Sequence, residues 1–157
     1  MNGINCRGYL SGNCSGLIPD LRTESMNILY LLKPKAMVSY VSTNATVRQG
    51  LEVMRAHGYT AIPVIDENGG YAGSVSEGDF LWHILRFSGD DLKSQELYSV
   101  MDIVNDERNL PVKINVSMDD LLLRVMDQNF VPVIDDRNIF IGIITRRDII
   151  KYFYDKL

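Results

Sequence analysis

The sequence predicts an α+β fold made of two pseudo-symmetric repeats, and three observations support this prediction. The stretches "YTAIPVIDENGGYAGSVSEGDFLWHI" and "FVPVIDDRNIFIGIITRRDIIKYF" align with each other. Each stretch follows apolar residues at helical spacing, contains two short apolar runs and ends in a second helical pattern. With 157 residues, 46% of them hydrophobic, the chain can form two small halves that bury a shared core.

Five aligned pairs define the repeat. They share one offset and are Pro63 with Pro132, Asp66 with Asp135, Gly73 with Gly142, Ser76 with Thr145 and Asp79 with Asp148. Internal similarity of this kind fixes the architecture, because neither unit alone can bury enough apolar surface. The predicted segments are a disordered tail (1–25), a first repeat (26–90), a polar connector (91–108) and a second repeat (109–157). Because the first apolar stretch begins at Met26, translation could also start there.

Each repeat is predicted to begin and end with a helix. Apolar residues three and four positions apart indicate the first helix, namely Val47, Leu51 and Met54 in one copy and Met118, Leu121, Leu122 and Val125 in the other. Suitable N-caps are Thr46 or Asn44, and Ser117. The closing helices read "EGDFLWHIL" and "RRDIIKYFY".

Between the helices, each repeat is predicted to form a β-hairpin. The first strands read "AIPVID" and "VPVID", the turns "ENGG" and "DRN", and the second strands "YAGSVS" and "FIGIIT". A proline cannot donate to a sheet ladder, so the first strand is expected at a sheet edge or beside a bulge.

The motifs "SEGD" and "TRRD" at the start of the closing helices have two interpretations. A hydroxyl followed three residues later by an acid is a helix-capping pattern. The same helix start offers N–H groups to an anion, the hydroxyl can donate to a phosphate, and the aspartate can accept both hydroxyls of a ribose. Arg146 and Arg147 suit phosphate, whereas Glu77 and Gly78 do not.

The order helix, "h-x-P-V-h-D", turn, "G-h-h-[ST]-x-x-D", helix, written twice, resembles a pair of CBS domains, the Bateman module. The resemblance covers the chain from about Val38 to Tyr154. It implies a non-catalytic sensor that binds an adenosine-containing ligand, such as AMP, ADP, ATP, S-adenosylmethionine or cyclic di-AMP, between the repeats. It also implies no obligatory cofactor and a signal passed to an unknown target protein. "GYTAIPV" with "TRRD" is further similar to small stand-alone CBS-pair proteins of Firmicutes-type bacteria, some of which are cyclic di-AMP receptors.

The resemblance implies two pockets. The first would combine Thr145, Arg146, Arg147 and Asp148 with Val38, Ser39, Tyr40, Tyr59, Thr60, Ala61 and Pro63. The second would combine Ser76, Glu77 and Asp79 with Pro111, Val112, Lys113, Phe130 and Val131. We expect the second pocket to be weaker or empty, because Phe130 is bulky near the base position and Glu77 faces the phosphates.

Composition disfavours several other classes. The formal charge of −4, with no basic stripe, argues against nucleic acid binding. Cys6 and Cys14 match no metal or redox motif, and the chain has no signal-like start and no apolar run near eighteen residues. We therefore expect a cytoplasmic protein without a metal site or membrane contact.

Two alternatives remain open. The chain could be a homodimeric interaction module whose ligand clefts are vestigial. Whether the chain is a sensor or an interaction module, we expect a homodimer, because the closing helices carry Phe80, Trp82, Ile149, Ile150 and Phe153 for a contact with a second copy. A hydrolase with Ser76 as nucleophile is the third hypothesis, because "SVSEG" partly matches a nucleophile elbow. Its leading glycine is missing, and neither histidine, His57 or His83, has a matching acid motif.

Overall fold

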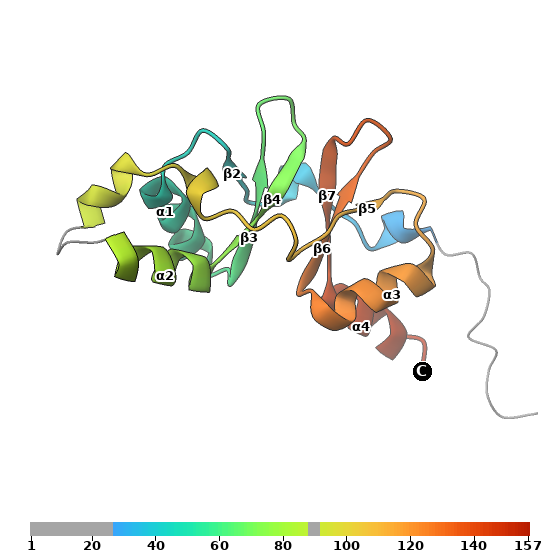
Figure 1. The fold of residues 1–157 in the computed structure, drawn as a ribbon. Helices are drawn as coiled ribbons and strands as arrows, with labels where there is room; N and C mark the ends of the chain where they lie inside the picture. Colours follow the sequence, from blue (N-terminus) through green and yellow to red (C-terminus); the bar gives the residue numbers. More distant parts are fainter. Residues whose placement is uncertain (1–26, 88–91) are drawn as a thin grey trace, which may run out of the picture.

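The computed structural model describes residues 27–87 and 92–157. The predicted disordered tail, residues 1–25, lies outside the described residues. Two halves stand side by side, with their β-sheets toward the middle and their helices toward the outside (Figure 1). Each half has its own buried cluster of apolar side chains. The predicted α+β architecture of two repeats is confirmed.

The first half contains a three-stranded sheet and two helices. The strands β2 (Val41–Ser42), β3 (Ala61–Ile65) and β4 (Tyr71–Ser76) lie in the order β2-β3-β4. The helix α1 (Val47–His57) begins at a capping box formed by Thr46 and Gln49. It ends at Gly58, whose φ of 63° lies in the left-handed region that favours glycine. The helix α2 (Glu77–Phe87) follows β4 directly.

The second half repeats this order. It comprises β5 (Val112–Lys113), α3 (Met118–Asp127), β6 (Phe130–Ile134), β7 (Phe140–Thr145) and α4 (Arg146–Tyr154). Ser117 is the N-cap of α3 and accepts a hydrogen bond from the Asp120 N–H, as its position before the helical pattern predicts.

An aspartate closes the turn of each hairpin. The Oδ1 atom of Asp66 accepts from the backbone N–H groups of Asn68 at 2.8 Å and Gly70 at 2.7 Å. Asp135 makes the equivalent bonds to Arg137 and Ile139, both at 2.8 Å. The aligned pair of aspartates therefore has a structural role, in which a side chain satisfies the backbone donors of a turn.

The proline strands are central, so the prediction of an edge position is wrong. Pro63 lies in β3, between β2 and β4, but the short strand β2 pairs only with Val64 and Ile65. The N–H that proline lacks is therefore not needed by the ladder. The alternative, a bulge, is confirmed, because the pairing register shifts between Val64 and Ile65 in β3 and between Val133 and Ile134 in β6.

The segment leading into each repeat pairs with the sheet of the other repeat. The strand β1 (Lys33–Pro34) is antiparallel to β7, although the sequence assigned it to the first repeat. Asn105 of the connector bridges Ser74 of β4 in the same way. Short 3-10 helices accompany these segments: η1 (Ile28–Tyr30), η2 (Lys35–Met37), η3 (Leu92–Leu97) and η4 (Val100–Asp102).

The two halves also meet at their hairpin turns. Gly70 bridges Ile139, and the Phe140 N–H donates to the Gly69 carbonyl at 2.8 Å. The rings of Tyr71 and Phe140 stack with centroids 6.2 Å apart. These contacts hold the repeats against each other, together with the two segments that pair with the opposite repeat. We call these the exchanged segments: β1, and the part of the connector that contains Asn105 and Arg108.

Candidate functional site

The two doubled motifs occupy the same position in the two halves, at the step from sheet to closing helix. Thr145 is the N-cap of α4, where its hydroxyl accepts from the Asp148 N–H at 3.2 Å and donates to the Asp148 carboxylate. In the first half, the Ser76 hydroxyl donates to Asp79 Oδ2 at 2.7 Å, and the same oxygen accepts from the Ser76 N–H at 2.7 Å. Both motifs therefore cap their helices, as the simpler interpretation predicts.

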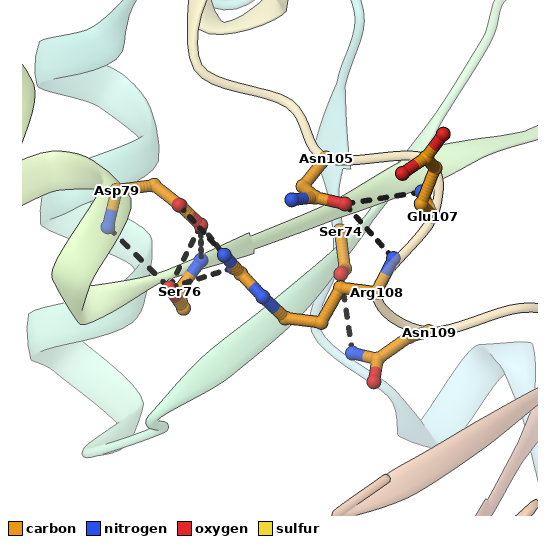
Figure 2. Close-up of polar contacts among 7 residues, drawn as sticks. All are labelled: Ser74, Ser76, Asp79, Asn105, Glu107, Arg108 and Asn109. Atoms are coloured by element: carbon orange, nitrogen blue, oxygen red, sulfur yellow. Dashed lines mark hydrogen bonds and ion pairs between the residues drawn. The ribbon is translucent and has the colours of Figure 1, made fainter. Parts of the chain in front are cut away.

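Each motif carboxylate also binds a basic side chain from the exchanged segment. The Lys33 Nζ atom lies 3.0 Å from Asp148 Oδ2, and Lys33 belongs to β1. The Arg108 guanidinium binds both oxygens of Asp79, with Nη2 3.0 Å from Oδ1 and Nη1 on Oδ2 (Figure 2). The segment that leads into each repeat thus places a cationic side chain beside the motif aspartate of the other repeat.

These contacts keep both carboxylates ionised. Burial works to raise the pKa of Asp79, but hydrogen bonds from Arg108 and Ser76 outweigh it, and the pKa lies below its ordinary value. The same balance lowers the pKa of Asp148, where hydrogen bonds from Thr145 and Lys33 outweigh burial. Both aspartates are therefore negatively charged at neutral pH.

A hollow of about 620 Å³ opens beside the second motif. It is lined by Asn129, Thr145, Arg146, Arg147, Ile150, Lys151 and Tyr154. Three of these side chains are cationic, and the N-terminal N–H groups of α4 add partial positive charge. The hollow can therefore attract a phosphate group, and its apolar residues can contact a base or sugar.

The two predicted phosphate ligands, Arg146 and Arg147, differ in their contacts. Arg146 Nε donates to the Val125 carbonyl at 2.7 Å, and Nη2 donates to the Met126 carbonyl at 3.3 Å. Its guanidinium thus binds the last carbonyls of α3, a contact that favours that helix end. Arg147 is exposed and makes no side-chain hydrogen bond or ion pair with any described residue. Arg147 is the more available phosphate ligand.

The predicted adenine-facing residues before the first helix follow the exchanged segment. The helix η2, which contacts β7, ends one residue before Val38. Val38 and Ser39 are half-buried, whereas Tyr40 is 40% exposed and its ring lies 5.1 Å from the Lys35 ammonium. This segment therefore runs next to the sheet that carries Thr145.

The remaining predicted wall residues lie at the start of β3. Ala61 pairs with Ser76, and the Thr60 carbonyl accepts from the Glu77 N–H at 3.1 Å. Tyr59 stacks on His57 with centroids 5.5 Å apart, and Pro63 is buried. Thr60 and Ala61 thus contact the motif of their own repeat. The hollow beside Thr145 includes none of these four residues.

The residues of the predicted second pocket also do not line one common hollow. Phe130 and Val131 are buried in β6, where they pair with Thr145 and Ile144. A larger hollow, of about 750 Å³, lies between the connector and α3 and includes Pro111, Val112, Lys113 and Arg108. It does not include Ser76 or Asp79. Instead, the Arg108 side chain lies against Ser76 and the Asp79 carboxylate (Figure 2).

Several residues at these sites were not predicted as ligand-binding residues from the sequence. Lys33 and Arg108 lie in the segments that cross between repeats, at positions that do not correspond to each other, so the repeat alignment gives no signal for them. Lys151 and Tyr154 line the hollow at α4. The helical spacing could have identified them, because they lie four and seven positions after Arg147, on the same face of the helix.

Comparison with known families agrees with this geometry. The model of the CBS domain matches residues 35–86 and 100–155. The chain belongs to the CBS-domain family. Its two matched segments correspond to the two halves of the structure, so the chain contains a tandem CBS pair.

Two solved structures show how this fold is used elsewhere. CbpB of Listeria monocytogenes, in complex with c-di-AMP, is 23% identical with a TM-score of 0.74, over 83% of this chain and 97% of that one. CBSX2 in complex with AMP is 24% identical with a TM-score of 0.66, over 82% of this chain and 96% of that one. At this identity, the likeness establishes the fold.

A curated relative of greater length matches part of this chain. The L-aspartate semialdehyde sulfurtransferase of Methanocaldococcus jannaschii is 23% identical over 116 residues, which are 73% of this chain. The match spans only 21% of the length of that protein. The comparison therefore concerns one part of the sulfurtransferase.

Two further observations concern a membrane and a metal ion. In the part of the chain that the structure describes, no helix combines the length and apolar character needed to cross a bilayer. Within residues 27–87 and 92–157, no group of three or more His, Cys, Asp or Glu side chains is arranged to hold a metal ion.

Proposed function

We propose that this chain is a non-catalytic regulatory module that senses an adenine nucleotide in a cleft between its two CBS repeats. The candidate ligands are AMP, ADP, ATP and cyclic di-AMP. The observation that carries this proposal is the hollow at the start of α4, where Thr145 lies together with three cationic side chains. The known CBS structures with c-di-AMP and AMP support the ligand class.

The chemistry of the hollow fits the parts of a nucleotide. Arg147 and Lys151 would bind phosphate oxygens, and the α4 N-terminus would contribute N–H groups. Asp148, which is ionised, would accept the ribose hydroxyls in place of the Lys33 ammonium. The other side of the proposed cleft would come from the first repeat, outside this hollow. There the adenine-facing wall would consist of Val38, Ser39, Tyr40, Tyr59, Thr60, Ala61 and Pro63.

Binding would couple the repeats. Lys33 comes from the segment that leads into the first repeat, while Asp148 belongs to the second. A ligand that competes for Asp148 would change a contact between them and so change the surface offered to a cytoplasmic partner protein. The module itself would catalyse no reaction. Ser76, the alternative nucleophile, is hydrogen-bonded to Asp79 and Arg108, and no histidine is among its partners.

A thermal-shift screen tests the ligand class. AMP, ADP, ATP, S-adenosylmethionine and cyclic di-AMP would each be added at increasing concentration to the full chain. A nucleotide that binds the folded state stabilises it by about 2.7 kcal/mol at one hundred times its Kd. We expect at least one adenine nucleotide to raise the melting temperature, while guanosine monophosphate does not. The absence of any responder would contradict the proposal.

Arg147→Ala tests the position of the phosphate. A charge-assisted hydrogen bond contributes about 1.5 kcal/mol or more, so the Kd of the responding nucleotide should rise about tenfold in isothermal titration calorimetry. Arg137→Ala is the matched control, because Arg137 is an exposed arginine in the β6–β7 turn. If both variants bind as tightly as the wild type, the phosphate does not lie at α4.

A homodimeric interaction module with vestigial clefts is the second candidate. It is favoured by exposed apolar side chains on both closing helices, namely Leu81, Trp82, Leu85, Ile150 and Tyr154. The same ligand screen separates the two candidates. A chain that dimerises but responds to no nucleotide is an interaction module.

A further inference from the structure

The two motif carboxylates, Asp79 and Asp148, differ in the number of contacts that they make with a cationic side chain. Asp148 has a single ammonium contact, from a Lys33 side chain that is 47% exposed. Asp79 is 17% exposed, and the Arg108 guanidinium contacts both of its oxygens. Arg108 Nη1 also donates to the Ser76 hydroxyl at 2.8 Å. The planar guanidinium thus contacts the Ser76 hydroxyl and both Asp79 oxygens, the atoms that a ribose or phosphate would use.

Arg108 is held in this place by its own backbone. Its N–H donates to Asn105 Oδ1 at 2.8 Å, and Asn105 exchanges two backbone hydrogen bonds with Ser74, of 3.0 and 2.9 Å. The next residue, Asn109, is buried and donates to Ser74 Oγ at 3.1 Å. Figure 2 shows the Asn105–Arg108 and Asn109–Ser74 bonds on either side of Arg108. Together these contacts fix the start of the Arg108 side chain close to β4.

We propose that the Arg108 side chain occupies the second predicted pocket, at Ser76 and Asp79, and excludes nucleotides from it. We call this pocket the second cleft, and the pocket at Thr145 and Asp148 the first cleft. This inference rests on the proposed function, because it takes the doubled motif to be the ligand-binding element. A nucleotide entering here would have to displace two guanidinium bonds to Asp79 and one to Ser76, whereas at Asp148 it displaces one exposed ammonium contact. The module therefore binds one nucleotide per chain, at the first cleft.

Removing the guanidinium should open the second cleft. In isothermal titration calorimetry with AMP and with cyclic di-AMP, we expect the wild type to bind one site per chain and Arg108→Ala to bind a second. Lys33→Ala, which removes the cation at the other motif, should leave the number of sites at one. Arg108→Gln keeps a donor for Asp79 without the charged fork, and it covers the case in which Arg108→Ala does not fold.

Trp82 provides a second readout near this cleft. It is the one tryptophan of the chain, and a Cβ at Gly78 would lie 3.6 Å from Ser76 Oγ and 4.0 Å from Trp82 Nε1. We expect nucleotide to change Trp82 fluorescence in the Arg108 variants at concentrations that leave wild-type fluorescence unchanged. This signal does not depend on counting sites.

The outcomes separate the inference from the proposed function. A wild type with two sites, or folded Arg108 variants that gain no site and no Trp82 signal, would overturn the role of Arg108. Weaker binding in these variants would also overturn it, because Arg108 would then be a ligand of the nucleotide. If the wild type binds no nucleotide but Arg108→Ala does, the inference stands and the first-cleft proposal fails.

Discussion

At the scale of single residues, Asp79 and Asp148 combine two roles. Each accepts a hydroxyl hydrogen bond at the start of its helix, and each binds a cation from a distant segment. Such contacts stabilise the fold only while the carboxylate is charged. Their contribution to stability must therefore depend on pH.

Acidification should weaken the fold through these two residues. Their folded-state pKa values lie below the ordinary value of an aspartate, about 3.9, so the stabilisation is present above that pH. It is lost as the pH falls through the folded-state values. In urea unfolding at pH 7, 5, 4 and 3, we expect Asp79→Asn to lower the unfolding free energy by about 1 to 2 kcal/mol at pH 7. We also expect it to flatten the loss of stability at acid pH.

Asp136→Asn is the control for this experiment. Asp136 is an exposed carboxyl in the turn between β6 and β7. This substitution should leave the pH profile of the wild type unchanged. If Asp79→Asn has the same acid dependence as the wild type, the Asp79–Arg108 contact does not stabilise the folded state.

At the scale of elements, the exchange of lead-in segments depends on two glycines. A Cβ on Gly142 would overlap the Lys33 carbonyl oxygen in β1. A Cβ on Gly73 would lie 2.6 Å from Val104 Cγ1 and 3.0 Å from the Asn105 carbonyl oxygen. Backbone and branched side chains cannot move aside easily, so the aligned glycines are explained by the close approach of the crossing segments.

Gly142→Ala should therefore separate β1 from β7. Overpacking of this kind costs about 3 kcal/mol, and we expect a clear fall in the melting temperature. Gly58→Ala is a useful comparison, because a Cβ there meets nothing within 4 Å although φ is +63°. Its cost should be about 1 kcal/mol, from backbone strain alone. Equal losses in the two variants would contradict the importance of the β1–β7 contact.

The sequence predicts those elements whose signal is local. Helix periodicity, N-caps such as Ser117 and the hairpin turns all depend on neighbouring residues, and the structure contains them at the expected places. The strand β1 was missed because two residues carry no periodicity and their partner lies more than a hundred residues away. Lys33 and Arg108 were missed for the same reason, since their roles exist only after the segments cross.

At the scale of the whole molecule, the closing helices leave an apolar surface uncovered. Phe80 and Ile149 are buried in the cores of their halves, so the prediction that they serve a dimer contact is wrong. Trp82 is 69% exposed and Ile150 62% exposed, and Leu81 and Leu85 correspond by the repeat to Ile150 and Tyr154. Both helices lie at the end of the hairpins away from the turns (Figure 1).

Matching patches on two pseudo-symmetric helices favour a second copy of the chain as the partner. In a two-fold interface the α2 patch of one copy can face the α4 patch of the other. Because Ile150 and Tyr154 also line the hollow at α4, the second copy would then border the nucleotide site. Tryptophan at the centre of such a contact commonly contributes about 2 kcal/mol or more. In size-exclusion chromatography with light scattering, we expect a wild-type dimer that Trp82→Glu converts to monomer. Leu97→Glu, at an exposed position on η3, should remain dimeric. A monomeric wild type, or a dimer that survives both Trp82→Glu and Ile150→Glu, would place the partner of these helices in another protein.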